Sequence, residues 1–170
     1  MKKLLYLFLS FTFVLLSACI KQNAQLPSNK GNRVDSTTIN LRTINEILTQ
    51  KEDSILKQFV DKQTESYTKT SSGIWYHKET ETQFDSLSKF KTVTFSYVLY
   101  TINGQKIKYE TIKIEFDKKQ IPVGLEEGLK TMKKGEKMRL IVPWYLGYGM
   151  KGKDNIPSYT TLVYQITVAN

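Results

Sequence analysis

The 170-residue sequence predicts an α+β protein in which an antiparallel sheet buries one face on a single short helix. Three observations support this fold class. Several segments after residue 73 alternate apolar and polar residues, which is typical of half-buried strands. One stretch among them, residues 124–136, spaces its apolar residues as a helix does. A longer helical pattern precedes the strands in residues 39–68.

The N-terminus resembles an export leader. A basic start is followed by an apolar stretch, Leu4–Ala18, which is short for a membrane-spanning helix and suits a signal peptide. Leu16-Ser17-Ala18-Cys19 resembles the bacterial lipobox, in which the cysteine thiol is acylated and becomes the N-terminus. We therefore expect a lipoprotein signal peptide over residues 1–18 and a lipidated Cys19. An ordinary secretory leader or an uncleaved anchor is the alternative.

Residues 19–38 are predicted to be a flexible tether. They are polar, contain Pro, Gly, Asn and Ser, and show no apolar period. Such a segment would let the folded part stand off from the membrane to which Cys19 is attached. The expected location is the bacterial cell envelope, lipid-anchored, in the periplasm or at the outer membrane.

Residues 39–68 are predicted to contain an amphipathic helix. Charged residues, among them Glu52 and Asp53, are expected on its solvent face. The apolar stripe must be covered, either by the chain's own domain or by a second copy in a homodimer through residues 39–66. The stripe is formed by residues at steps of three, four and seven: Leu41, Ile44, Leu48, Ile55 and Phe59.

Alternating residues predict the strands of the folded domain, residues 69–170. The segment "KIKYETIKIEF" alternates with a change of phase, which predicts a β-bulge near Glu110–Thr111. Asn103–Gly104 predicts a hairpin turn. The predicted inward residues are Val93, Phe95, Tyr97 and Leu99, then Met138, Leu140 and Val142, then Leu162, Tyr164, Ile166 and Val168.

The helix predicted within residues 124–136 should pack on that sheet. Leu125, Leu129 and Met132 follow one another at i, i+4 and i+7, which places them on one face. Gly135 is expected to end the helix.

Charge and composition exclude several classes of function. The formal net charge is +9, but lysines are scattered without a dense arginine-containing cluster, so no nucleic-acid partner is expected. The chain has one cysteine, so an intrachain disulfide is impossible. It also has one histidine. No residues near that histidine have the spacing of metal ligands or of a catalytic triad, so neither a metal site nor a triad is expected.

The segments "GLEEGLKTMKKGEKMRLIVPWYLGYG" and "IPSYTTLVYQITV" resemble the second half of the FKBP-type peptidyl-prolyl cis-trans isomerases. "SSGIWYHK" and "VTFSYVLYTINGQKI" resemble the first half. The resemblance covers about residues 69–170. With the lipobox and the preceding helix, the chain looks like the extracytoplasmic lipoprotein branch, and within it like the gliding-motility-associated FKBP lipoproteins of Bacteroidetes.

This resemblance implies an antiparallel sheet of five to six strands wrapped around one short helix, with a proline pocket between them. It implies prolyl isomerisation and help with the folding of envelope proteins, acting on their proline-containing segments without cofactor or metal. The catalytic residues would be Tyr148 and Tyr97. Substrate-binding residues would be Ile107, Lys108, Ile114, Ile121, Pro122, Leu125, Ile156 and Tyr164.

Four residues depart from the family pattern. Lys108 stands where the family has an aspartate, so we expect the hydrogen bonding between that carboxylate and the pocket tyrosines to be lost. Leu125 replaces a tryptophan on the floor, and Ile107 and Ile114 replace phenylalanines. These departures predict a lower isomerase activity. The alternatives are a catalytically weak FKBP-fold chaperone or protein-binding module, and a structural lipoprotein whose helix mediates assembly.

Overall fold

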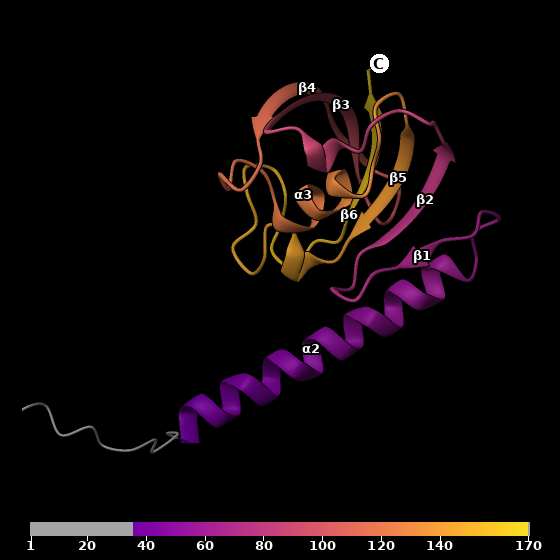
Figure 1. Ribbon diagram of the computed structural model, residues 1–170. Coiled ribbons are helices and arrows are strands. Elements are labelled where there is room, and N and C mark those ends of the chain that lie inside the picture. The colour runs from indigo at the N-terminus through magenta and orange to yellow at the C-terminus, as the bar shows by residue number, and fades with distance from the viewer. Residues whose placement is uncertain (1–35, 170) are drawn as a thin grey trace, which may run out of the picture. The chain divides into compact units, whose positions relative to one another are not determined.

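The computed structural model describes residues 36–169, with side chains from residue 40 onward (Figure 1). The expected signal peptide over residues 1–18, the lipidated Cys19 and the tether up to residue 35 lie outside the described residues. Residues 36–38, which we expected in the tether, form the start of a helix instead. None of the helices among the described residues is long and apolar enough to cross a membrane.

Six strands form one antiparallel sheet in the order β1-β2-β5-β6-β3-β4, which confirms the predicted fold class. The two hairpins β1-β2 and β3-β4 take the two edges, and β5 and β6 fill the space between them (Figure 1). The strands are β1 (Thr68–Lys69), β2 (Trp75–Thr80), β3 (Thr92–Thr101), β4 (Lys106–Glu115), β5 (Lys137–Val142) and β6 (Leu162–Val168).

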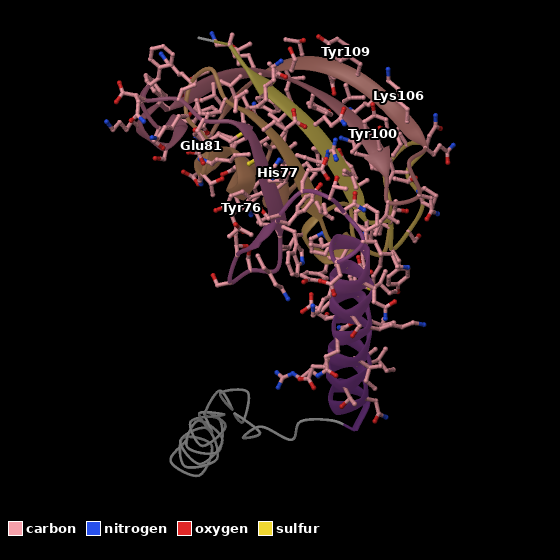
Figure 2. All side chains as sticks on the ribbon, turned by 90° about the vertical axis from the view of Figure 1, so that its right-hand side faces the viewer. Tyr76, His77, Glu81, Tyr100, Lys106 and Tyr109 are labelled. Atoms are coloured by element: carbon pink, nitrogen blue, oxygen red, sulfur yellow. The ribbon has the colours of Figure 1, made fainter. Side chains whose placement is uncertain are left out.

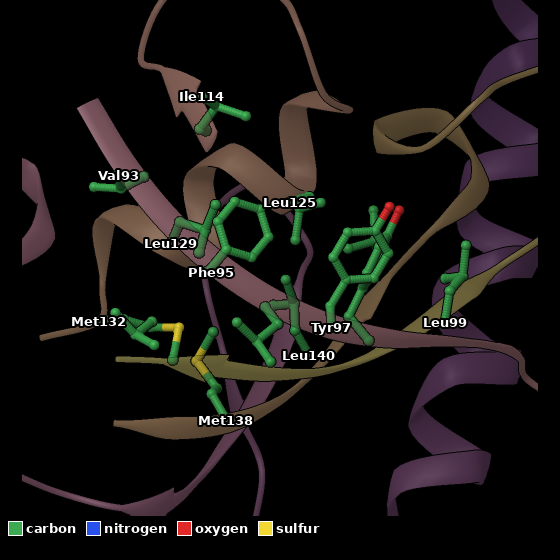
Figure 3. Close-up of a cluster of buried hydrophobic side chains, with 14 of the residues drawn as sticks. Val93, Phe95, Tyr97, Leu99, Ile114, Leu125, Leu129, Met132, Met138 and Leu140 are labelled. Atoms are coloured by element: carbon green, nitrogen blue, oxygen red, sulfur yellow. The ribbon is translucent and has the colours of Figure 1, made fainter. Parts of the chain in front are cut away.

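The sheet curves around helix α3 (Val123–Lys130), and the main core lies between them. The predicted inward residues of β3, β5 and β6 are all buried, as their alternation requires. In Figure 3, Leu125 and Leu129 point from α3 toward the rings of Phe95 and Tyr97. The helix lies close to β5, since a Cβ atom added at Gly128 would come within 2.4 Å of a Leu140 methyl group.

Helix α3 is shorter than the sequence predicted. It ends at Lys130, and Thr131 is its C-cap, with the Thr131 hydroxyl donating to the Gly128 carbonyl at 2.7 Å. Gly135 therefore lies in the turn that leads into β5 and does not end the helix. Met132 is nevertheless fully buried, because the chain continues along the core after the helix.

The β3-β4 hairpin has the predicted turn but a different bulge. The Thr101 amide donates to the Gln105 carbonyl at 2.9 Å around Asn103–Gly104, which confirms the turn. The ladder is regular down to the pair Leu99–Lys108 and resumes at Tyr100–Lys106. The bulge therefore lies at Ile107, and the expected position near Glu110–Thr111 is wrong.

The position of the bulge at Ile107 determines which side chains of β4 face inward. Glu110 pairs directly with the inward residue Tyr97, so the two side chains share a face of the sheet. Tyr109 points outward and is 62% exposed. Figure 2 shows it at the outer margin of the sheet.

Helix α2 (Ser36–Val60) packs its C-terminal half on the outer face of the sheet. Leu56 and Val60 are buried against Ile141 of β5 and Val163 of β6. This observation supports packing on the chain's own domain for that half. The helix ends at Val60, earlier than the predicted boundary.

Two acidic residues of α2 make contacts with the folded domain that the sequence did not predict. Glu52 is 8% exposed and accepts a hydrogen bond from the Thr161 hydroxyl. Asp53 pairs with Lys69 at 3.0 Å and accepts from the Tyr145 hydroxyl at 3.3 Å. The expectation that Glu52 faces solvent is wrong, whereas the side chain of Asp53 remains 37% exposed. The apolar side chains that remain exposed on the helix are Leu41, Ile44, Ile47 and Ile55.

Candidate functional site

Three tyrosines gather at one end of the inner face of the sheet. Tyr97 of β3 and Tyr164 of β6 meet edge to face, with ring centroids 5.4 Å apart. Tyr148, in the loop after β5, packs against the same core and is half-buried. The buried Tyr164 hydroxyl lies beside Tyr148, but no well-aligned hydrogen bond satisfies it among the described residues. Burial, followed by the nearby Tyr148 and Tyr97, raises the pKa of Tyr164 well above its ordinary value.

The loop over residues 143–149 holds Tyr148 at this position. Trp144 is 7% exposed and meets Tyr145 and Tyr159 edge to face, at 5.6 Å and 4.9 Å. The Gly149 amide donates to the Trp144 carbonyl at 2.9 Å, which closes the loop on itself. Trp144 and Tyr145 thus fix the loop, and Tyr148 is the aromatic residue that it presents to the core.

The apolar residues expected around the tyrosines divide into a deep set and an edge set. Leu125 at the start of α3 and Ile156 are buried. Ile107, Ile121 and Pro122 are half-buried, so they form the solvent-facing edge. We call this group, with Tyr97, Tyr148 and Tyr164, the tyrosine recess.

Ile114 does not lie beside the tyrosines. It pairs with Val93, whereas Tyr97 pairs with Glu110, and Ile112 lies between Ile114 and Glu110 on the inward face of β4. Ile114 is buried in the same core but belongs to its other end. Its expected place in the pocket wall is not supported by this register.

A polar group borders the recess on β4. The Tyr97 hydroxyl donates to Glu110 Oε2 at 2.5 Å, and Lys108 Nζ lies 2.6 Å from the same oxygen. Lys108 Nζ is also 5.5 Å from the centroid of the Tyr97 ring. The expected loss of a carboxylate partner is therefore wrong for Tyr97, because Glu110 supplies one.

The sequence carried a signal for Glu110 that the predicted bulge position hid. Counting back in steps of two from Ile114 and Ile112 gives Glu110 and Lys108 on the inward face. A bulge at Glu110–Thr111 would have broken that count. The bulge at Ile107 preserves it.

The charges of this group are fixed at neutral pH. Burial and then the hydrogen bond to Glu110 raise the pKa of Tyr97 to about 12. The hydrogen bonds from Lys108 and then Tyr97 lower the pKa of Glu110. Burial opposes the charge of Lys108, but its contacts with Glu110 and Tyr97 outweigh burial and raise its pKa. The site thus holds a neutral phenol, a carboxylate and an ammonium group.

Two cavities flank the tyrosine recess. One of about 760 Å³ borders Ile107 and extends between the β3-β4 hairpin, residues 155–161 and Glu52 of α2. The other, of about 340 Å³, borders Ile121 and the first turn of α3. The recess is therefore bordered by open space on two sides. Among residues 36–169, no three His, Cys, Asp or Glu side chains are grouped as metal ligands.

Comparisons with known proteins agree with this architecture. A family model for FKBP-type peptidyl-prolyl cis-trans isomerases matches residues 85–169. FkpA from Buchnera aphidicola (Acyrthosiphon pisum), an FKBP-type isomerase, is 34% identical over 101 residues, 58% of this chain and 42% of that protein. A probable FKBP-type isomerase from Haemophilus influenzae is 31% identical over 103 residues, 58% of this chain and 43% of that protein.

Solved structures share the fold. The crystal structure of FkpA from Escherichia coli superposes with a TM-score of 0.62 and 24% identity, over 78% of this chain and 62% of that one. The matched segment spans about two fifths of the length of the curated relatives. The family model covers half of the present sequence and includes the recess from Tyr97 to Tyr164. This chain belongs to the family of FKBP-type peptidyl-prolyl cis-trans isomerases.

Proposed function

We propose that this chain catalyses the cis-trans isomerisation of prolyl peptide bonds and assists the folding of proteins in the bacterial cell envelope. The observation that carries the proposal is the tyrosine recess, a mostly apolar group of residues whose Ile107 and Ile121 each border an adjoining cavity. It lies in a chain of the isomerase family.

The recess can accelerate rotation without a nucleophile. The barrier of about 20 kcal/mol arises from amide resonance, which the twisted transition state has lost. An apolar surrounding disfavours the planar, more polar amide relative to that transition state. Ile107, Ile121 and Leu125 would surround the prolyl ring, and the flanking cavities would take the chain on either side.

The three tyrosines would have different roles in binding the peptide. Tyr148, at the half-exposed edge, would donate its hydroxyl hydrogen to a carbonyl next to the proline. The buried hydroxyl of Tyr164, which lies beside Tyr148 without a well-aligned hydrogen bond, is a second donor in the same cluster. The Tyr97 hydroxyl is already bonded to Glu110, so Tyr97 would act through its ring as a wall.

A protease-coupled assay on a proline tetrapeptide tests this function. The soluble chain from residue 20 should isomerise the peptide above background. Tyr148→Ala should lose most of that activity, because the edge of the recess loses both ring and donor. The matched control is Tyr109→Ala, since Tyr109 is an exposed tyrosine on the outward face of β4. Turnover at background level in the unmodified protein rejects the proposal.

Anchoring through Cys19 is part of this proposal. Two or more acyl chains on one cysteine hold a protein to a bilayer far more firmly than one chain does. Mass spectrometry of the membrane fraction should show an acylated Cys19 as the N-terminal residue. A soluble Cys19→Ser protein would support the anchor, and an unchanged membrane fraction would reject it.

A catalytically weak chaperone or protein-binding module is the alternative function. Two observations favour it: the Lys108 cation on the recess wall, and the exposed apolar residues Leu41, Ile44 and Ile47 on α2. The three exposed apolar residues of α2 are also the proposed contact surface of a homodimer through residues 39–66. Light scattering should then give a monomer mass for the triple variant with Gln at the three positions, and a dimer mass for the unmodified chain.

A further inference from the structure

A second lysine stands at the mouth of the tyrosine recess. Lys153 Nζ lies 5.6 Å from the centroid of the Tyr148 ring. Lys108 takes the corresponding position over Tyr97 at 5.5 Å. An ammonium group thus lies over each of two tyrosines of the recess, and these two lysines come from different parts of the chain.

The backbone of Lys153 is fixed to the wall of the recess. Its amide donates to the Ile156 carbonyl at 3.0 Å, and the Ile156 amide donates back to the Lys153 carbonyl at 2.8 Å. Gly152 makes this tight turn possible, with φ of +66° and a missing Cβ that would lie 2.2 Å from the Ile156 oxygen. Because Ile156 is itself buried in the recess, the lysine is held at its edge.

The charges around the recess do not cancel. Glu110 is the carboxylate beside it, and Lys108 and Tyr97 both contact Glu110 Oε2. No ion pair within 4.0 Å joins Lys153 to a carboxylate in the described part of the chain, although its charge is close enough to Glu110 to help lower the pKa of that carboxyl group. Two ammonium groups and one carboxylate leave an excess positive charge beside the position where a peptide would bind.

We propose that the site selects prolyl bonds flanked by an acidic residue, with Lys153 as the specificity-determining residue and Lys108 supporting it. This inference rests on the proposed function. An Asp or Glu adjacent to the proline would lie at the mouth of the recess, where the unpaired Lys153 is its natural partner. A basic residue at the same place would meet a like charge.

Exchange NMR on acetylated, amidated tetrapeptides tests this selection without a coupling protease. The pair Ala-Glu-Pro-Phe and Ala-Gln-Pro-Phe differs by one charge at nearly constant shape, and Ala-Leu-Pro-Glu with Ala-Leu-Pro-Gln places it after the proline. At low salt, kcat/KM should favour the acidic member of at least one pair about three- to tenfold, as expected for a partly exposed ion pair. The preference should shrink in 0.5 M NaCl, because salt screens the attraction.

Two variants assign the preference. Lys153→Gln should bring the ratio of acidic to neutral peptide close to one. Lys113→Gln makes the same charge change on an exposed residue of β4 that points away from the recess, and it should keep the ratio. A ratio of one or less in both peptide pairs with the unmodified protein overturns the inference, as does an unchanged preference in Lys153→Gln.

The failure of this inference is distinguishable from that of the proposed function. Turnover of the neutral peptides tests isomerase activity, whereas the ratio within a pair tests selection. If no peptide is turned over, amide shifts of the ¹⁵N-labelled protein give the two dissociation constants instead. Equal constants for the acidic and neutral peptides would then overturn the selection.

Discussion

One helix covers each face of the sheet, but the apolar core beneath α3 is much larger than the one beneath α2. The inner face and α3 enclose a core of large apolar residues that extends the length of β3, β5 and β6. The outer face meets α2 through Leu56, Val60, Ile141 and Val163 together with the buried carboxyl group of Glu52. The comparison indicates that the inner face holds the fold and forms the recess, whereas the outer face attaches an accessory helix.

A cavity in the core beneath the inner face should have the largest effect on the free energy of unfolding. Phe95 is 1% exposed and stacks near Tyr97, with centroids 5.8 Å apart. Phe95→Ala should lower the free energy of unfolding by about 3–5 kcal/mol, because both apolar burial and packing are lost. Urea unfolding followed by tryptophan fluorescence measures this. A loss below about 1 kcal/mol would contradict the assignment of the main core to this face.

The same kind of change on the outer face should act locally. Leu56→Ala removes a fully buried side chain and should cost about 2–3 kcal/mol. Hydrogen exchange should show that the second half of α2 loses protection while β3 keeps it. Equal loss of protection in both elements would mean that α2 is an integral part of the fold and not an attachment.

The buried hydroxyl of Tyr164 separates function from stability within the recess. Tyr164→Phe removes a buried hydroxyl that makes no well-aligned hydrogen bond among the described residues, so stability should stay within about 0.5 kcal/mol or rise. If that hydroxyl serves the bound peptide, kcat/KM should fall about tenfold, or about 1.4 kcal/mol. Unchanged activity would remove Tyr164 as a donor.

The two faces should respond to pH in opposite directions. Desolvation raises the pKa of Glu52, so the attached helix holds more protons than the detached one above pH 4.5. Attachment should weaken as pH rises through the window between that value and the raised pKa. For Glu110, whose pKa is lowered, the stabilisation is present above pH 4.5 and is lost as pH falls through the lowered value.

Glu52→Gln is the sharpest test of this contrast, with the smallest expected effect. The variant should abolish the pH dependence of α2 protection and raise that protection slightly at neutral pH. Hydrogen exchange at several pH values, corrected for intrinsic rates, measures it. A steeper pH dependence in the variant would contradict the assignment to Glu52.

Local sequence patterns predicted the inner face well. Strict alternation identified the inward residues of β3, β5 and β6, and the i, i+4, i+7 spacing identified Leu125, Leu129 and Met132. These positions succeed because one face of each element is buried and the other is not. Asn103–Gly104 predicted its turn because few residue pairs suit that backbone.

The predictions that were wrong or missing concern features that depend on contacts between residues distant in sequence. The spacing on α2 could not show that Glu52 would be buried, because its partner Thr161 lies on the loop before β6. The sequence placed the bulge a few residues away from Ile107, and this difference alone concealed that Glu110 faces inward. Lys153 was missed because its place depends on the turn at Gly152 and on the position of Tyr148.

The most direct test of the account compares one variant from each face in the same catalytic measurement. Exchange NMR should give the rate of prolyl isomerisation of Ac-Ala-Leu-Pro-Phe-NH₂ with the unmodified protein, Tyr148→Ala and Leu56→Ala. We expect catalysis by the unmodified protein, little change in Leu56→Ala and a large loss in Tyr148→Ala. Full activity in Tyr148→Ala, or loss of activity in Leu56→Ala alone, would contradict the placement of the site in the tyrosine recess.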